Sequence, residues 1–331
     1  MTKRSYSVTW FVAALVLISF PHFCIAQSSW KPQKNIEMIV GAGAGAAADA
    51  TARTMQRILL DKKLVQNSIT VSNRPGGGYA VAWNYMNSHP GDGHFIAPTA
   101  LSLITNAVTG ANSLTYADVT PIAQLFTDYV VHAVRADSPI KDSKDLTERL
   151  RRDPVSLSIA LAAARGNQNH LATALAMRLA GGVDVKSLKI VIFDSSALSM
   201  TALLGGHVDV VAATALNVLP HLKAGRIRVI ATSSPERLRG ELAGIPTWKE
   251  QGVNMVFDNW RGVIGPRGMP AAQVAFWEGA LASMVATEEW KAYLEKNYLT
   301  HSFMNSRNSR KFLEEETAKI SAVLTDLGLA K

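Results

Sequence analysis

The chain has 331 residues, of which 48% are hydrophobic and 18% charged, and its formal net charge is +8. A chain of this length can bury a large core and is long enough for two domains. Its basic residues are spread along the sequence rather than gathered in Lys/Arg runs, which argues against a nucleic-acid-binding arm and slightly favours anionic ligands.

The N-terminus has the pattern of a secretory signal peptide. Lys3 and Arg4 precede an apolar run over residues 10–20, which is too short to span a membrane. We expect cleavage after Ala26, so that residues 1–26 are the signal peptide and 331 − 26 = 305 residues remain. Cleavage removes Cys24, the only cysteine, and lowers the net charge to 8 − 2 = +6. The residues before Cys24 do not resemble a lipobox, so we expect a soluble periplasmic protein without disulfides.

The first element of the mature chain is a strand, a glycine loop and a helix. Residues 36–40 are mostly apolar and β-prone, and the alanine-rich segment 46–60 favours a helix. Three glycines in residues 41–45 allow the backbone to approach a ligand, and the free N–H groups of a helix start accept a phosphate or a carboxylate. The spacing G-x-G-x-G is neither a dinucleotide fingerprint nor a P-loop. The alternative is that this loop is only a tight connection.

Strands and helices alternate along the rest of the chain. Strands are predicted at 68–73, 95–97, 155–161, 189–193, 208–213 and 227–231, with two β-rich runs at 122–126 and 129–134. Helices are predicted at 79–87, 142–151, 170–179, 197–204 and 218–224, and the C-terminal part is helical with two apolar stripes facing the core. This order predicts an α/β protein with mostly parallel sheets.

The segments predict two α/β lobes with a ligand cleft between them. Residues 27–127 and 258–331 would form lobe 1, and residues 128–257 would form lobe 2. The chain would cross between lobes near Phe126 and Trp260, which makes a hinge.

No local catalytic motif is present in the sequence. None of the histidines has the H-E-x-x-H spacing, no G-x-S-x-G occurs, and no acid/base pair of carboxylates is evident. We therefore expect a protein that is not an enzyme and that uses no metal or cofactor. An exported, hydrolase-like enzyme that uses the same cleft stays as an alternative.

Five short stretches share their order and spacing with one family. They are N-R-P-G-G-G at 73–78, P-G-D-G at 90–93 followed by His94, L-L-G-G-H-V-D at 203–209, P-H-L-K-A-G at 220–225, and I-P-T at 245–247 with Glu250 and Gly252. From about Trp30 to the C-terminus, the chain resembles the periplasmic solute-binding proteins of tripartite tricarboxylate transporters, the Bug-type receptors. The resemblance implies a two-lobed periplasmic binding protein of type II-like fold, with a β-sheet flanked by helices in each lobe.

The resemblance also implies the ligand, the partners and the site. Such a receptor closes on a small carboxylate, a di-/tricarboxylate or an aromatic acid, and delivers it to membrane permease subunits. We expect a monomer; a ligand-sensing subunit for signalling is the other alternative. The implied ligand-binding residues are Gly41, Ala42, Gly43, Ala44, Gly45, Ala46 and Asp49 in the first loop, Thr99 and Ser102 just past the strand at 95–97, Ala164, Arg165, Gly166, Asn167 and Gln168 in the second loop, and Ser195, Ser196 and Thr214.

Four of these residues have roles that can be considered from the sequence. Asp49 would either brace its loop or contact the ligand. Asn167 and Gln168 are candidates for direct hydrogen bonds to the ligand. Arg165 would either clamp a carboxylate with two parallel bonds or lie solvated in its loop.

Overall fold

The computed structural model describes residues 1–2, 30–162, 165–193 and 195–331. The predicted signal peptide and its cleavage site lie outside these residues, except for Met1 and Thr2. Within the described ranges, no helix has both the length and the apolar character needed to cross a bilayer.

Strands and helices alternate through most of the chain. The strands are β1 (Ile36–Val40), β2 (Ile69–Asn73), β3 (Phe95–Ala100), β4 (Val119–Arg135), β5 (Ser158–Ala162), β6 (Lys189–Phe193), β7 (Val210–Thr214), β8 (Ile227–Thr232), β9 (Asp258–Pro266) and β10 (Thr300–Met304). The helices are α1 (Ala47–Asp61), α2 (Ala80–Asn87), α3 (Ser102–Val108), α4 (Ser143–Arg152), α5 (Gln168–Ala180), α6 (Ser196–Leu204), α7 (Ala215–Lys223), α8 (Ala271–Val285), α9 (Glu288–Lys296) and α10 (Ser306–Asp326).

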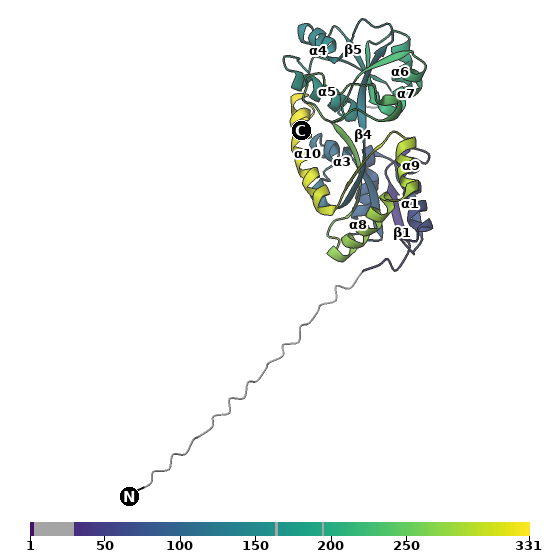
Figure 1. Ribbon diagram of the computed structural model, residues 1–331, viewed down its shortest axis with the longest axis vertical. Coiled ribbons are helices and arrows are strands. Elements are labelled where there is room, and N and C mark those ends of the chain that lie inside the picture. The colour runs from purple at the N-terminus through teal and green to yellow at the C-terminus, as the bar shows by residue number, and fades with distance from the viewer. Residues whose placement is uncertain (3–29, 163–164, 194) are drawn as a thin grey trace.

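The long strand β4 is the centre of the sheet. The strand order is β2-β1-β3-β9-β4-β7-β5-β6, and β8 and β10 also pair with β4. We call β2, β1 and β3 with α1–α3, α8 and α9 the first half, and β7, β5 and β6 with α4–α7 the second half. Figure 1 shows β4 running from one half into the other, with α10 along one side of both.

The prediction of mostly parallel sheets is wrong at the centre. Pairing is parallel within β2-β1-β3 and within β6-β5-β7, whereas β4 and β9 pair antiparallel with their neighbours. The two predicted runs at 122–126 and 129–134 belong to the single strand β4. Thr127 and Asp128 join them without a break because both pair with β9. Strand β10 had no counterpart in the prediction.

The pairing directions make the carboxyl ends of the two parallel sets face each other. Strands β3 and β4 run the same way because both are antiparallel to β9, while β7 runs against β4 and β5 and β6 follow β7. Ala100, at the end of β3, is in register through Arg261 with Phe126, and Thr214, at the end of β7, is in register with Val130. The two edges are therefore four residue steps apart along β4, which corresponds to about 13 Å of strand.

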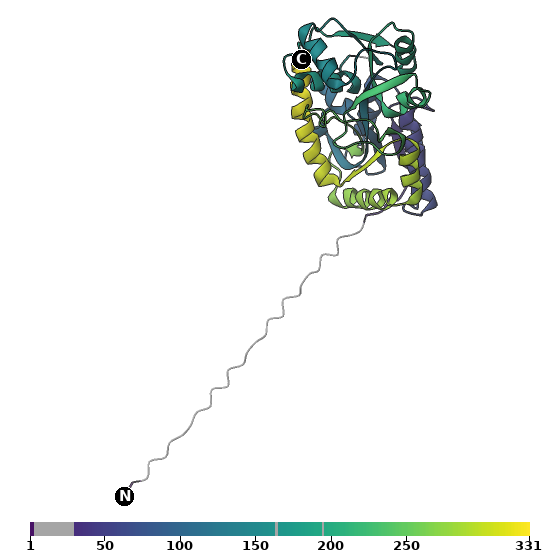
Figure 2. The ribbon, with the colours of Figure 1, turned by 45° about the horizontal axis from the view of Figure 1, so that its top comes forward.

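The apolar stripes of the C-terminal helices are confirmed as core surfaces. On α8, Trp277, Leu281 and Met284 are buried against the first half. On α10, Ile320 and Leu324 are buried in a cluster with residues of the second half, and α10 also contacts α3. Figure 2 shows the same placement of α10 along the side of the molecule. Helix α10 packs against both halves and so does not mark where one lobe ends and the other begins. The lobe boundaries at 127 and 257 therefore stay a prediction.

Side-chain caps account for several helix starts. The side chain of Asp142 caps α4, that of Thr287 caps α9 and that of Asn305 caps α10 by accepting backbone N–H groups of the first turn. Similarly, Asn167 caps α5, which begins at Gln168 rather than at the predicted residue 170. The strand predicted from residue 155 begins at Ser158, because Asp153 folds the preceding residues into a turn by accepting the N–H of Val155 at 3.1 Å.

Candidate ligand-binding site

Six helices begin at the two facing edges of the sheet. Helices α1, α2 and α3 follow β1, β2 and β3, and helices α5, α6 and α7 follow β5, β6 and β7. The N–H groups and positive dipole ends of these helix starts lie at the carboxyl edges of the strands. Edges of this kind, facing each other across the central strands, suit an anionic ligand.

The first loop is built from close backbone packing. A Cβ atom on Gly41 would lie 2.5 Å from Cδ1 and 2.7 Å from Cα of Tyr79, so only glycine fits there. Ala42 and Ala46 are partly buried, and Gly43, Ala44 and Gly45 are exposed. Ala46 is the N-cap of α1 and has no side chain that can accept a bond. The exposed surface of this loop is therefore mainly backbone.

Asp49 braces the first loop. It is 2% exposed, its Oδ2 accepts the N–H of Gly45 and Nε of Arg53, each at 2.9 Å, and its Oδ1 accepts Nδ2 of Asn73 at 2.9 Å. Asn73 also donates to the carbonyl of Ala42 at 2.9 Å. The bonds from Arg53 and Gly45 outweigh burial and lower the pKa of Asp49 to about 2. This geometry favours the bracing interpretation over direct contact with an anion.

The second loop has the same kind of bond between a glycine N–H and a side chain four residues on, but the acceptor is a neutral histidine. The N–H of Gly166 donates to Nδ1 of His170 at 2.9 Å, four residues on, as Gly45 does to Asp49. Both glycines have positive φ, 81° for Gly45 and 80° for Gly166. Burial, aided by the charge of Arg165, lowers the pKa of His170 to about 4, so the ring is neutral at pH 7. The second loop therefore lacks the negative charge that Asp49 brings to the first.

The side chain of Asn167 is used by the protein itself. Its Oδ1 accepts the N–H groups of Asn169 and His170, each at 3.1 Å, and its Nδ2 donates to the carbonyl of Ala162. Gln168 is the first residue of α5 and is partly buried, and Arg165 is exposed. Ala164 lies outside the described residues. Arg165 and Gln168 are thus the side chains of this loop that suit ligand contact.

Thr99 does not lie where the sequence placed it. It is inside β3, paired with Gly262 of β9, rather than past the end of the strand. Its side chain is buried and lines a cavity of about 10 Å³ together with Gln124 and Trp260. Because β9 extends the pairing to Ala100, the strand is longer than the prediction of 95–97. Ser102 begins α3 and is partly buried.

Asn217 joins two helix starts of the second half, and the sequence analysis missed it. Its Nδ2 donates to Oγ of Ser196 at 3.2 Å and to Oγ1 of Thr214 at 3.1 Å. Ser195 caps α6, and its Oγ accepts the N–H of Leu198 at 3.3 Å. The three predicted hydroxyl residues Ser195, Ser196 and Thr214 thus lie at one edge. The signal for Asn217 was a polar residue directly before the predicted helix 218–224, which in the structure begins earlier, at Ala215.

A buried chain of hydrogen bonds also holds the start of α5, and the sequence analysis missed it. Nε1 of Trp248 donates to Nδ1 of His132 at 3.3 Å, and Nε2 of His132 donates to Oγ1 of Thr173 at 3.0 Å. Thr173 in turn donates to the carbonyl of Asn169 at 2.8 Å. Burial lowers the pKa of His132 to about 4. These residues come from β4, α5 and the segment before β9, so no local motif could have revealed them.

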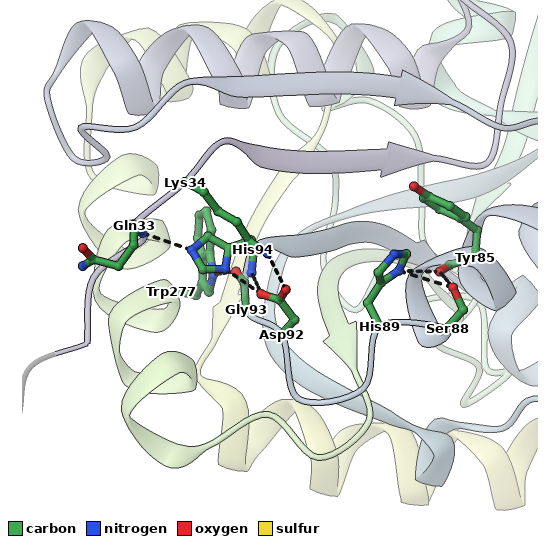
Figure 3. A network of polar contacts seen from close by, with 9 residues as sticks. All are labelled: Gln33, Lys34, Tyr85, Ser88, His89, Asp92, Gly93, His94 and Trp277. Carbon is green, nitrogen blue, oxygen red and sulfur yellow. Dashed lines mark hydrogen bonds and ion pairs between the residues drawn. The ribbon is translucent and has the colours of Figure 1, made fainter.

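The turn at residues 90–93 has a structural role at the opposite, amino-terminal edge of β3 (Figure 3). His94 bridges two segments, since its Nε2 accepts the N–H of Gln33 at 3.0 Å and its Nδ1 lies 2.5 Å from Oδ1 of Asp92. Lys34 also bonds Asp92, at 2.9 Å, and Nε1 of Trp277 donates to the carbonyl of Gly93 at 2.7 Å. The network ties the residues before β1 and helix α8 to this turn. Within the described residues, no group of three or more His, Cys, Asp or Glu side chains is placed to hold a metal ion.

Comparison with known proteins establishes the family. Residues 51–329 match the family described as "Tripartite tricarboxylate transporter family receptor". This match covers most of the chain, and the chain therefore belongs to that family of periplasmic solute-binding proteins.

Solved structures agree with the fold. A TctC solute-binding protein from Polaromonas, without ligand, matches with a TM-score of 0.79 and 24% identity over 89% of this chain and 99% of that one. An R. palustris protein with adipate matches with a TM-score of 0.73 and 23% identity over 90% and 99%. MatC from Rhodopseudomonas palustris, with bound malate, matches with a TM-score of 0.68 and 22% identity over 88% and 99%. The predicted periplasmic-binding-protein fold is confirmed.

Proposed function

We propose that this protein is a periplasmic receptor that captures one small carboxylate between the two facing edges and delivers it to the permease subunits of a tripartite transporter. The observation that carries the proposal is the opposed direction of the parallel strands, which points helix starts of both halves toward a common space. The malate- and adipate-bound relatives of the same fold support a carboxylate ligand.

The carboxylate is held by backbone N–H groups of both loops and by Arg165. The first loop offers mainly backbone, because residues 41–46 are all glycine or alanine. Arg165 is exposed at the second loop, where a guanidinium can make two parallel bonds to a carboxylate. Binding draws the two halves together, with β4 and β9 as the connecting strands.

A panel of mono-, di- and tricarboxylates in a thermal-shift screen tests this function. A ligand present at about 100 times its Kd adds about 2.7 kcal/mol to the free energy of unfolding. Calorimetry with the best compound is expected to give one site per chain. Chemical turnover of the bound compound, or the failure of every carboxylate to bind, would refute the receptor proposal.

A further inference from the structure

We infer that this receptor selects carboxylates with a hydrocarbon body, aliphatic or aromatic, over compact hydroxylated di- and tricarboxylates. The inference rests on the proposed function and names the ligand class of that same site. Two independent features of the facing edges support it: three exposed apolar side chains at the helix starts, and three polar side chains that are already bonded within the protein.

Three large apolar side chains are exposed in the first turns of helices that begin at the facing edges. Val81 of α2 is 50% exposed, Leu198 of α6 is 49% exposed and Leu216 of α7 is 45% exposed. In a helix every Cα–Cβ bond tilts toward the N-terminus, so these side chains lean along the helix axis toward the edge at which their helix begins. Both halves contribute to this apolar rim. Apolar surface held at a binding site gains free energy when a hydrocarbon group covers it.

Three polar side chains at the same edges, those of Asp49, Asn167 and Asn217, have partners within the protein. The carboxylate of Asp49 is bound to Gly45, Arg53 and Asn73. The amide of Asn167 caps α5, and that of Asn217 bonds Ser196 and Thr214. A ligand hydroxyl would have to compete with these bonds to be bound by the same groups, so Asp49, Asn167 and Asn217 give a hydroxylated ligand little advantage.

The charges at the site determine which group the ligand presents at the end opposite its hydrocarbon body. The exposed guanidinium of Arg165 and the helix starts favour a carboxylate, while Val81, Leu198 and Leu216 favour the hydrocarbon body. The competing possibility is that the three apolar side chains meet one another when the halves close. In that case the length of the ligand's hydrocarbon chain would have no effect on affinity.

Calorimetric titration with butyrate, pentanoate, hexanoate and phenylacetate, compared with malate and citrate, separates the two possibilities. We expect affinity to rise about fourfold with each methylene group until the space is filled. Leu198→Ser and Leu216→Ser should each lower the ratio of hexanoate to malate affinity by about tenfold. The matched control is Leu179→Ser, because Leu179 is also 49% exposed but lies in the last turn of α5, away from the edges. It should leave the ratio unchanged.

The outcomes separate this inference from the proposed function. Binding of malate or citrate with no rise along the aliphatic series would overturn the inference and leave the receptor function intact. An unchanged ratio in both Leu198→Ser and Leu216→Ser, with unfolding midpoints like that of wild type, would also overturn it. If none of the six acids binds, both the inference and the function are refuted. A rise with chain length that these two variants flatten, and Leu179→Ser does not, supports the inference.

Discussion

Replacing Asp49 with asparagine keeps the shape of the side chain but should weaken the hydrogen bonds that hold the first loop. The carboxylate accepts three bonds, with Gly45 and Arg53 on one oxygen and Asn73 on the other. An amide must turn its NH₂ group toward one of these two sets of donors, so at least one bond becomes a clash between donors. Hydrogen bonds to a charged group contribute about 1.5–3 kcal/mol, and a buried donor left without a partner costs about 1–3 kcal/mol. We therefore expect Asp49→Asn to lower the free energy of unfolding by about 2–4 kcal/mol.

The effect should depend on pH in a defined direction. The pKa of Asp49 is lowered to about 2 in the folded protein, below its ordinary value of 3.8. The stability that the carboxylate provides is therefore complete above about pH 5 and is lost as pH falls through the range from about 4 to 2. The difference between wild type and Asp49→Asn should accordingly shrink as the pH is lowered below about 4.

Urea unfolding followed by circular dichroism at pH 7, 4 and 3 measures this difference. Asp61→Asn is the matched control, because it makes the same chemical change in the same helix at an exposed position, and it should alter stability by less than about 0.5 kcal/mol. Equal stability of wild type and Asp49→Asn at pH 7, or a difference that stays constant down to pH 3, would refute the bracing role.

Three further predictions follow from the site. Gly41→Ala should lower the free energy of unfolding by about 1–3 kcal/mol, because the added Cβ meets Tyr79. Gly43→Ala, where the added Cβ has open space, should not lower it, and urea unfolding of both variants compares them. Since burial lowers the pKa of His132 to about 4, wild type loses stability as pH falls from about 6.5 to 4, and His132→Gln should lose less over this range; a parallel pH profile would contradict this. Arg165→Ala should weaken carboxylate binding about ten- to a hundred-fold and Arg165→Lys should recover part of it, measured by calorimetry at fixed salt; equal affinities of wild type and Arg165→Ala would remove Arg165 from the site.

The elements defined by local patterns could be predicted from the sequence. The strand Ile36–Val40 and the helix after it were predicted within one residue, because apolar periodicity, a glycine loop and an alanine-rich segment are all local signals. The end of β3 and the continuity of β4 were not predicted, because both depend on pairing with β9, whose residues lie more than 120 positions away. Long-range pairing leaves no mark in a short window of sequence.

Side-chain roles were predicted less well than elements. Asn167 was considered for ligand contact, although an asparagine just before a helix is also an N-cap signal, and the structure gives it that role. The positions of Asn217 and His132 became visible only when separate helices and strands came together. Where a site is made of backbone N–H groups, as in the first loop, residue identity carries little information about the ligand. Glycine and alanine specify the path of the chain but not what binds to it.

The central claim is that one carboxylate is held between the first loop and the second. Hydrogen exchange of the backbone amides, measured with and without the best-binding carboxylate, tests it most directly. We expect the amides at 43–49 and at 165–170 to be protected together, with the same dependence on ligand concentration and saturation at one ligand per chain. Protection of only one of these loops, or protection confined to residues away from both edges, would contradict the account.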